Sequence, residues 1–266
     1  MLEPLRAAGI EVFEIGVFEP DQVPAAALRR AMEAAGLQAS VCAILPAGIN
    51  PISPVAAERR RAQQHLQRVI AVAAEMGASI VGGPVYAPIG YLPGHRPTPE
   101  EWQWMAELLH ATTASLDAYG VTLCLEPVNR AETHIVRTAA DARRLCESVP
   151  HPRIGVTLDT FHANIEEKSL PGAIRLLGPL LRHVHVSEND RGIPGTGQVD
   201  LPVMIAALRE TGYAGCLLLE GFGYLAEERE APGWLWAEQD VTPERVALEG
   251  AACLRRLLQQ PGHTAR

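Results

Sequence analysis

Residues 154–159, IGVTLD, form a short apolar run that ends on an aspartate and is followed by the segment TFH. Such a run is typical of a parallel strand buried on both faces, and ligands bind beyond the carboxyl ends of such strands. The pattern recurs in VTLCLE (121–126), HVHVS (183–187) and CLLLE (216–220). The polar side chains at these ends are Glu126, Asp159, His185 and Glu220. Three carboxylates and one imidazole in this arrangement predict one metal centre.

Strand-like runs alternate with helical patterns along the whole chain, which indicates βα units and a parallel sheet. The expected strands are 11–18, 40–45, 78–83, 121–126, 154–159, 182–187 and 216–220. The expected helices are 21–36, 54–76, 99–119, 138–148, 169–178, 201–211 and 241–258. Ser53-Pro54, Thr98-Pro99 and Thr242-Pro243 each place a hydroxyl residue before a proline, a pattern typical of a helix start.

We therefore expect an α/β fold, a (β/α)8 TIM barrel that lacks its first β-strand. A closed barrel has eight strands and roughly 250 residues, whereas this chain of 266 residues offers seven strand-like runs. It opens on LEPLRAAGI (2–10), which is similar to the tail of a helix. The simplest explanation is that a first strand and part of its helix are absent. No low-complexity linker divides residues 1–266, so we expect a single domain.

Composition argues against several classes of protein. The formal charge of −8 disfavours binding through nucleic-acid phosphates. The five cysteines form no CxxC pair, so we expect no disulfide framework and a reducing compartment. The chain begins with no signal peptide, and no apolar stretch is long enough to span a bilayer. We expect a cytoplasmic protein that acts on neither nucleic acid nor a membrane.

The predicted ligands form a mostly hard donor set. This set suits Mn²⁺, Mg²⁺ or Co²⁺ better than an ion that prefers thiolates, with Zn²⁺ as an alternative. We expect Mn²⁺ first. His183 shares a face with His185 because alternate strand residues point the same way, but it lies roughly 6.6 Å nearer the barrel floor. We therefore predict His185 as the ligand and His183 as a hydrogen-bonded interior histidine.

The loops after these strands supply a second group of polar side chains. Glu132 follows Glu126 by six positions, and His162 follows Asp159 by three. Arg191 follows His185 at a similar reach. Each of the three could be an ordinary loop or surface residue. Their proximity to the predicted ligands favours contact with a substrate.

Four segments resemble a known family: LEPVNRAE (125–132), LDTFHANIEE (158–167), HVHVSENDRGIPGTGQVD (183–200) and LLLEGF (217–222). They are similar to the xylose isomerase-like TIM barrels, most of all to the D-tagatose 3-epimerase and D-psicose (D-allulose) 3-epimerase group. GGPVYAPIG (82–90) and the tryptophan-bearing GWLWAEQD (233–240) also resemble this group. The family's first strand has no counterpart in the chain.

The resemblance implies a role for each candidate residue. The metal ligands would be Glu126, Asp159, His185 and Glu220. Of these, Glu126 and Glu220 would also be the catalytic acid and base. The ketose oxygens would be bound by Glu132, His162 and Arg191. The partner would be a small sugar, and family members are often homodimers or homotetramers.

The candidate residues also fit an epimerisation reaction on chemical grounds, independently of the family resemblance. Inverting a carbon beside a ketone requires removing its proton and returning one to the opposite face. This favours two bases on opposite sides of the substrate, which Glu126 and Glu220 could provide. We expect a metal-dependent ketose 3-epimerase that passes through a cis-enediolate. The alternative is an aldose–ketose or hydroxypyruvate-type isomerase, or a sugar-derived dehydratase, at the same metal site. An abasic-site endonuclease and a non-catalytic sugar-binding barrel rank behind these.

Overall fold

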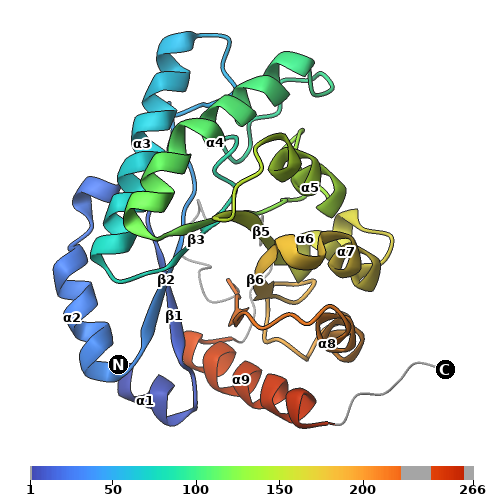
Figure 1. Cartoon of the computed structure of the whole chain (residues 1–266). Helices are drawn as coiled ribbons and strands as arrows, with labels where there is room; N and C mark the ends of the chain where they lie inside the picture. The colour runs from blue at the N-terminus through green and yellow to red at the C-terminus, as the bar shows by residue number, and fades with distance from the viewer. Residues whose placement is uncertain (1, 223–240, 261–266) are drawn as a thin grey trace.

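The computed structural model describes residues 2–222 and 241–260, so the segment 233–240 lies outside the described residues. Parallel strands form one sheet whose spatial order is the order of the chain. They are β1 (Val12–Gly16), β2 (Gln38–Cys42), β3 (Ile80–Gly83), β4 (Thr122–Leu125), β5 (Ile154–Asp159), β6 (Leu181–Val186) and β7 (Leu217–Leu219). The sheet curls into a nearly closed barrel with helices outside it (Figure 1). The predicted α/β barrel with seven strands is confirmed.

Helices connect the strands and cover the outer surface of the barrel (Figure 1). They are α1 (Leu2–Ala7), α2 (Ala25–Ala35), α3 (Ala56–Glu75), α4 (Pro99–Tyr119), α5 (Ala139–Ser148), α6 (Thr160–Glu166), α7 (Leu170–Leu177), α8 (Leu201–Glu210) and α9 (Pro243–Gln259). All the expected helices are present. α6 was not expected, and it makes His162 a helical residue instead of a loop residue.

Capping side chains account for two of the three predicted helix starts. Thr98 accepts a hydrogen bond from the N–H of Glu101, whose carboxylate accepts from the N–H of Thr98, so α4 begins with a capping box. Thr242 caps α9 in the same position. The prediction for Ser53 was wrong, because its hydroxyl accepts from the N–H of Val55 and closes a turn before α3 begins.

Side chains fill the barrel interior as well as the layer between strands and helices. Leu66 and Ile70 of α3 and Leu109 of α4 are fully buried in the outer layer. Inside the barrel, a Cβ at Gly82 would lie 3.0 Å from Thr157 Oγ1 and 3.6 Å from His183 Cδ2. The absence of a side chain at Gly82 therefore leaves room for the Thr157 hydroxyl, whereas a Cβ there would make only an ordinary van der Waals contact with the His183 ring.

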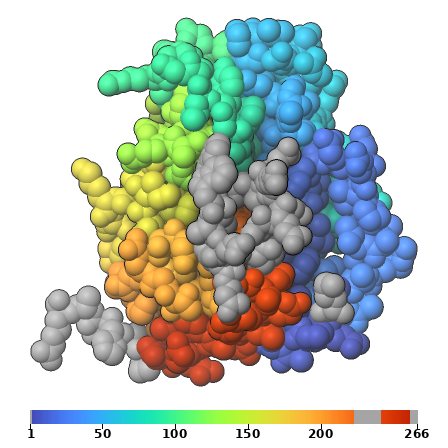
Figure 2. Space-filling view, turned by 180° about the vertical axis from the view of Figure 1, so that it is seen from behind, coloured from blue at the N-terminus to red at the C-terminus, as the bar shows by residue number. Residues whose placement is uncertain are grey.

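The barrel has a seam between its first and last strands. Among the described residues β1 pairs with β2 and β7 with β6, but β1 and β7 share no hydrogen-bonded ladder. A cavity of about 1170 Å³ opens there, lined by apolar side chains such as Ile10, Leu219 and Leu254. The outer ring is continuous, since α9 lies between α8 and the N-terminal residues in both views (Figures 1 and 2).

Candidate metal centre and substrate site

The predicted ligands lie together at the carboxyl ends of their strands. Glu126, Asp159, His185 and Glu220 each offer one ligand atom, and these atoms all lie within 4.8 Å of one another. Backbone bonds fix the two glutamates, because the N–H of Glu126 donates to Gly83 O and that of Glu220 donates to Val186 O. The sheet thus brings together four residues that are up to 94 positions apart in the sequence.

His185 is the centre of this group. Its Nδ1 lies 3.5 Å from Glu126 Oε1 and 3.9 Å from Glu220 Oε1. Like Nε2 of the same ring, this nitrogen is buried and has no hydrogen-bond partner among the described residues. A bare, buried nitrogen that faces carboxylate oxygens is a suitable place for a divalent cation, since such a cation would complete the coordination of all these atoms. The residues present therefore fit a metal ion.

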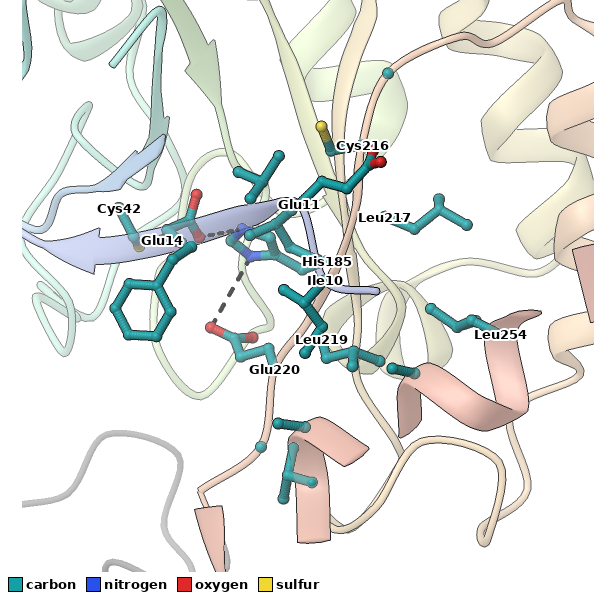
Figure 3. A pocket seen from close by; sticks show the side chains of 18 of the residues that line it. Ile10, Glu11, Glu14, Cys42, His185, Cys216, Leu217, Leu219, Glu220 and Leu254 are labelled. Carbon is teal, nitrogen blue, oxygen red and sulfur yellow. Dashed lines mark ion pairs between the residues drawn. The ribbon is translucent and has the colours of Figure 1, made fainter. Parts of the chain in front are cut away.

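The other side of the His185 ring contacts a residue that sequence analysis did not identify. Glu14 of β1 places Oε1 2.7 Å from His185 Nε2 and Oε2 2.9 Å from His183 Nε2. Figure 3 shows the His185 ring between Glu14 and Glu220. His183 is fully buried below the ligand group, as predicted for a hydrogen-bonded interior histidine. An acidic residue inside the apolar run EVFEIGVF (11–18) was the available indication of Glu14.

Arg191 lies directly on the predicted ligands. Its guanidinium Nη1 is 2.7 Å from Asp159 Oδ2 and 2.5 Å from Glu220 Oε2, and it also donates to Ser187 Oγ. The charged group packs 3.9 Å from the centre of the Phe161 ring. The side chain is buried, so these charge-assisted bonds are shielded from water. Arg191 therefore partly neutralises the carboxylates in this structure.

Burial and neighbouring charges shift the ionisation of the site. Burial disfavours a charged His185, but the nearby carboxylates outweigh this effect and raise its pKa well above the usual value. Burial alone would raise the pKa of the Asp159 carboxyl, yet the positive charge of Arg191 holds this pKa below its usual range. Burial raises the pKa of Glu220, and the Asp159 carboxylate adds to the effect. The raised pKa values of His185 and Glu220 reflect the negative potential of carboxylates clustered in a buried space, and a bound cation would relieve that potential in place of protons.

His162 and Glu132 form a second group beside the ligands. Asn129 joins them, since its amide Nδ2 lies 2.8 Å from Glu132 Oε1 and 2.9 Å from His162 Nδ1. The backbone N–H of Asn129 also donates to His162 Nδ1. That nitrogen is therefore an acceptor, and burial lowers the pKa of the ring. Sequence analysis did not identify Asn129, although it lies within the motif LEPVNRAE.

The loop that carries Arg191 has an unusual backbone conformation. Arg191 has a backbone φ of 59°, in the left-handed region that residues other than glycine rarely adopt. Its carbonyl accepts from the N–H of Phe222, which ties this loop to the segment after β7. A Cβ at Gly221 would lie 3.0 Å from Arg191 O, so glycine permits this close approach. The loops that carry Arg191 and Glu220 are thus locked together.

In the described part of the chain, no helix is long and apolar enough to cross a membrane.

Comparisons with known proteins agree with the barrel fold. The family model for the xylose isomerase-like TIM barrel matches residues 2–257. An L-ribulose 3-epimerase of Mesorhizobium japonicum is 33% identical over 217 residues, which cover 82% of this chain and 73% of that protein. A D-psicose 3-epimerase of Agrobacterium fabrum is 30% identical over 234 residues, with coverage of 83% and 78%. The structure of D-allulose 3-epimerase from Methylomonas sp. in complex with D-allulose has a TM-score of 0.89 at 25% identity, and the match covers 96% and 89% of the two chains.

Proposed function

The chain belongs to the xylose isomerase-like TIM barrel family, and on that premise we propose that it is a metal-dependent ketose 3-epimerase acting on a free ketohexose or ketopentose. The observation that carries the proposal is the bare Nδ1 of His185, which faces Glu126 and Glu220. The named relatives support a sugar epimerase, since they are 3-epimerases of ribulose and psicose.

The metal would be held by Glu126, Asp159, His185 and Glu220, with His185 binding through Nδ1. Oxygen donors dominate this set, which favours Mn²⁺ first and Mg²⁺ or Co²⁺ next. When bound, a divalent metal polarises the substrate carbonyl and acidifies the neighbouring C–H.

Glu126 and Glu220 are proposed to move the protons. They follow β4 and β7, strands that are separated by two others in the barrel, so they approach the site from different directions. One glutamate removes the C3 proton of the ketose to give a cis-enediolate. The other then returns a proton to the opposite face, which inverts C3.

Glu132, His162 and Arg191 are proposed to bind the ketose oxygens. Arg191 has a further consequence for the chemistry, because its guanidinium donates to Oε2 of Glu220. An oxygen that accepts this charged hydrogen bond is a poor base. Arg191 must therefore transfer the bond to the substrate before that oxygen of Glu220 can take up a proton.

A ketose panel in D₂O, with and without a chelator, tests the proposal by NMR. We expect deuterium at C3 of at least one ketose, and no exchange once the metal is removed. Deuterium at C1 or C2, or loss of water, would select the aldose–ketose isomerase or the dehydratase. Absence of exchange from every free ketohexose and ketopentose in the presence of Mn²⁺ would refute the epimerase.

The expectations for domain organisation, cellular location and oligomeric state stay predictions. We propose that residues 1–266 act as one domain, that the enzyme works in the cytoplasm, and that it forms a homodimer or homotetramer. Size-exclusion chromatography with light scattering measures the last of these.

A further inference from the structure

We propose that Glu14 is a positioning residue for the metal site: its carboxylate holds the Nε2 side of the His185 ring so that the Nδ1 lone pair faces Glu126 and Glu220. The inference rests on the proposed function, because it assumes that His185 is a metal ligand. Glu14 belongs to β1 and His185 to β6, so the contact crosses the interior of the barrel (Figure 3).

The two oxygens of Glu14 have different partners. Oε2 accepts from the Ser40 hydroxyl at 2.9 Å and lies 2.9 Å from His183 Nε2. Oε1 lies 2.7 Å from His185 Nε2. Ser40 is the register partner of Glu14 on the neighbouring strand. Because Ser40 and His183 occupy Oε2, the carboxylate is fixed in a position where Oε1 is left for His185.

This contact selects one form of the His185 ring. The 2.7 Å approach of Glu14 Oε1 to His185 Nε2 is an ion-pair contact, and neither ring nitrogen of His185 has a hydrogen-bond partner among the described residues. Because a carboxylate oxygen only accepts hydrogen bonds, its charge beside Nε2 favours the ring form with the proton on that nitrogen. A neutral ring with its proton on Nε2 has its lone pair on Nδ1, which is the nitrogen that faces the predicted ligands. Metal-binding histidines commonly donate their other N–H to a carboxylate, which orients the ring and raises its basicity.

A simpler interpretation is that Glu14 merely pairs with His183. The His183 ring is fully buried and contacts Oε2 at hydrogen-bond distance, so that pair would exist without any metal. The two interpretations differ in what the loss of the Glu14 charge would do. If Glu14 serves His183 alone, its loss would affect folding and leave metal affinity unchanged. If it orients His185, metal affinity must fall.

Glu14→Gln keeps the shape of the side chain and removes its charge. One end of the amide then presents N–H groups to a histidine, so this residue can no longer offer an acceptor oxygen to both rings. We expect the Mn²⁺ affinity to fall about 10- to 100-fold by titration calorimetry. We also expect kcat to fall at saturating Mn²⁺ while KM for the ketose holds, because no described contact joins Glu14 to Glu132, His162 or Arg191. Glu14→Asp keeps the charge and should lose less affinity.

Glu11→Gln is the matched control. It is the same change just before the same strand, at a side chain that is 76% exposed and whose nearest charged partner, Arg6, is 3.9 Å away. We expect this variant to bind Mn²⁺ as the unaltered protein does. A folded Glu14→Gln variant whose Mn²⁺ affinity stays within about twofold of the Glu11→Gln control would overturn the inference.

A second measurement does not depend on any variant folding. In the Mg²⁺-loaded, unaltered protein, long-range ¹H–¹⁵N NMR reports which nitrogen of His185 carries the proton. We expect the proton on Nε2, and a proton on Nδ1 would refute the inference.

The variants Glu126→Gln and Glu220→Gln separate the proposed function from the proposed role of Glu14. If these variants keep full C3 exchange, the proposed function fails. If they are inactive while Glu14→Gln keeps the metal affinity and activity of the unaltered protein, only the proposed role of Glu14 fails.

Discussion

Replacing Arg191 by methionine should make the protein bind its metal more tightly while it loses activity. Methionine keeps an apolar stem of similar length and removes the guanidinium. In the metal-free protein, Asp159 and Glu220 would then lose the cation that lies 2.7 Å and 2.5 Å away. Removing one partner of a buried ion pair typically costs about 3–5 kcal/mol. We take the lower end, about 3 kcal/mol, because Glu220 can accept a proton and relieve part of the cost.

The bound metal changes this cost. With two positive charges among the carboxylates, the loss of Arg191 should cost about 1 kcal/mol or less. By linkage, the difference of about 2 kcal/mol appears as a roughly 30-fold higher affinity for the metal. Activity should nevertheless fall, since Arg191 is proposed to bind the ketose.

Two measurements check the Arg191 prediction. Urea unfolding with chelator and with saturating Mn²⁺ gives the two stabilities, and titration calorimetry gives the affinity. Arg175→Met is the matched control, because its guanidinium lies 2.7 Å from Glu210 on the surface with both side chains about half exposed. That variant should lose at most about 1 kcal/mol and keep its metal affinity. An Arg191→Met variant with unchanged or weaker metal binding would refute the electrostatic argument.

Three further predictions follow from the same geometry. Asn129→Leu removes the amide that serves both predicted sugar-binding side chains, so KM should rise roughly tenfold in steady-state assays while calorimetry finds the metal affinity unchanged. Metal binding must displace protons from Glu220 and His185, whose pKa values are raised without metal, so affinity should increase with pH until both are deprotonated. Calorimetry in buffers of different ionisation enthalpy should detect this release, and no dependence on buffer would contradict it. Gly221→Ala brings a Cβ to 3.0 Å from Arg191 O and should cost about 1–3 kcal/mol in thermal unfolding.

The barrel and its predicted ligands could be found from sequence because their pattern is local. Each strand is a short apolar run with a polar residue at its end, and parallel strands bring such ends together whatever the details of packing. The α4 helix matches its predicted range 99–119, since Thr98 and Gly120 mark both ends. The sequence analysis did not predict α6, because this helix follows β5 with no intervening loop. The last residue of β5, Asp159, is itself the cap, since its carboxylate accepts a hydrogen bond from the N–H of Phe161.

Glu14 and Asn129 could not be identified in this way. Glu14 lies in the middle of its strand, and its contact with His185 joins residues that are 171 positions apart. That contact depends on the curvature that brings β1 close to β6, which no local pattern encodes. Asn129 depends on the path of its loop, which turns the backbone N–H and the side-chain amide toward the same nitrogen of His162.

The seam between β1 and β7 gives the site an uneven resistance to local opening. A strand with one hydrogen-bonded neighbour can detach at a lower free energy than one held on both sides. Among the described residues, β1 carries Glu14, and β7 leads directly into Glu220, so two sides of the site depend on such strands. Backbone amides of β1 and β7 should therefore exchange with deuterium before those of β4 and β5. Mild denaturant should then abolish turnover while most of the barrel is still folded.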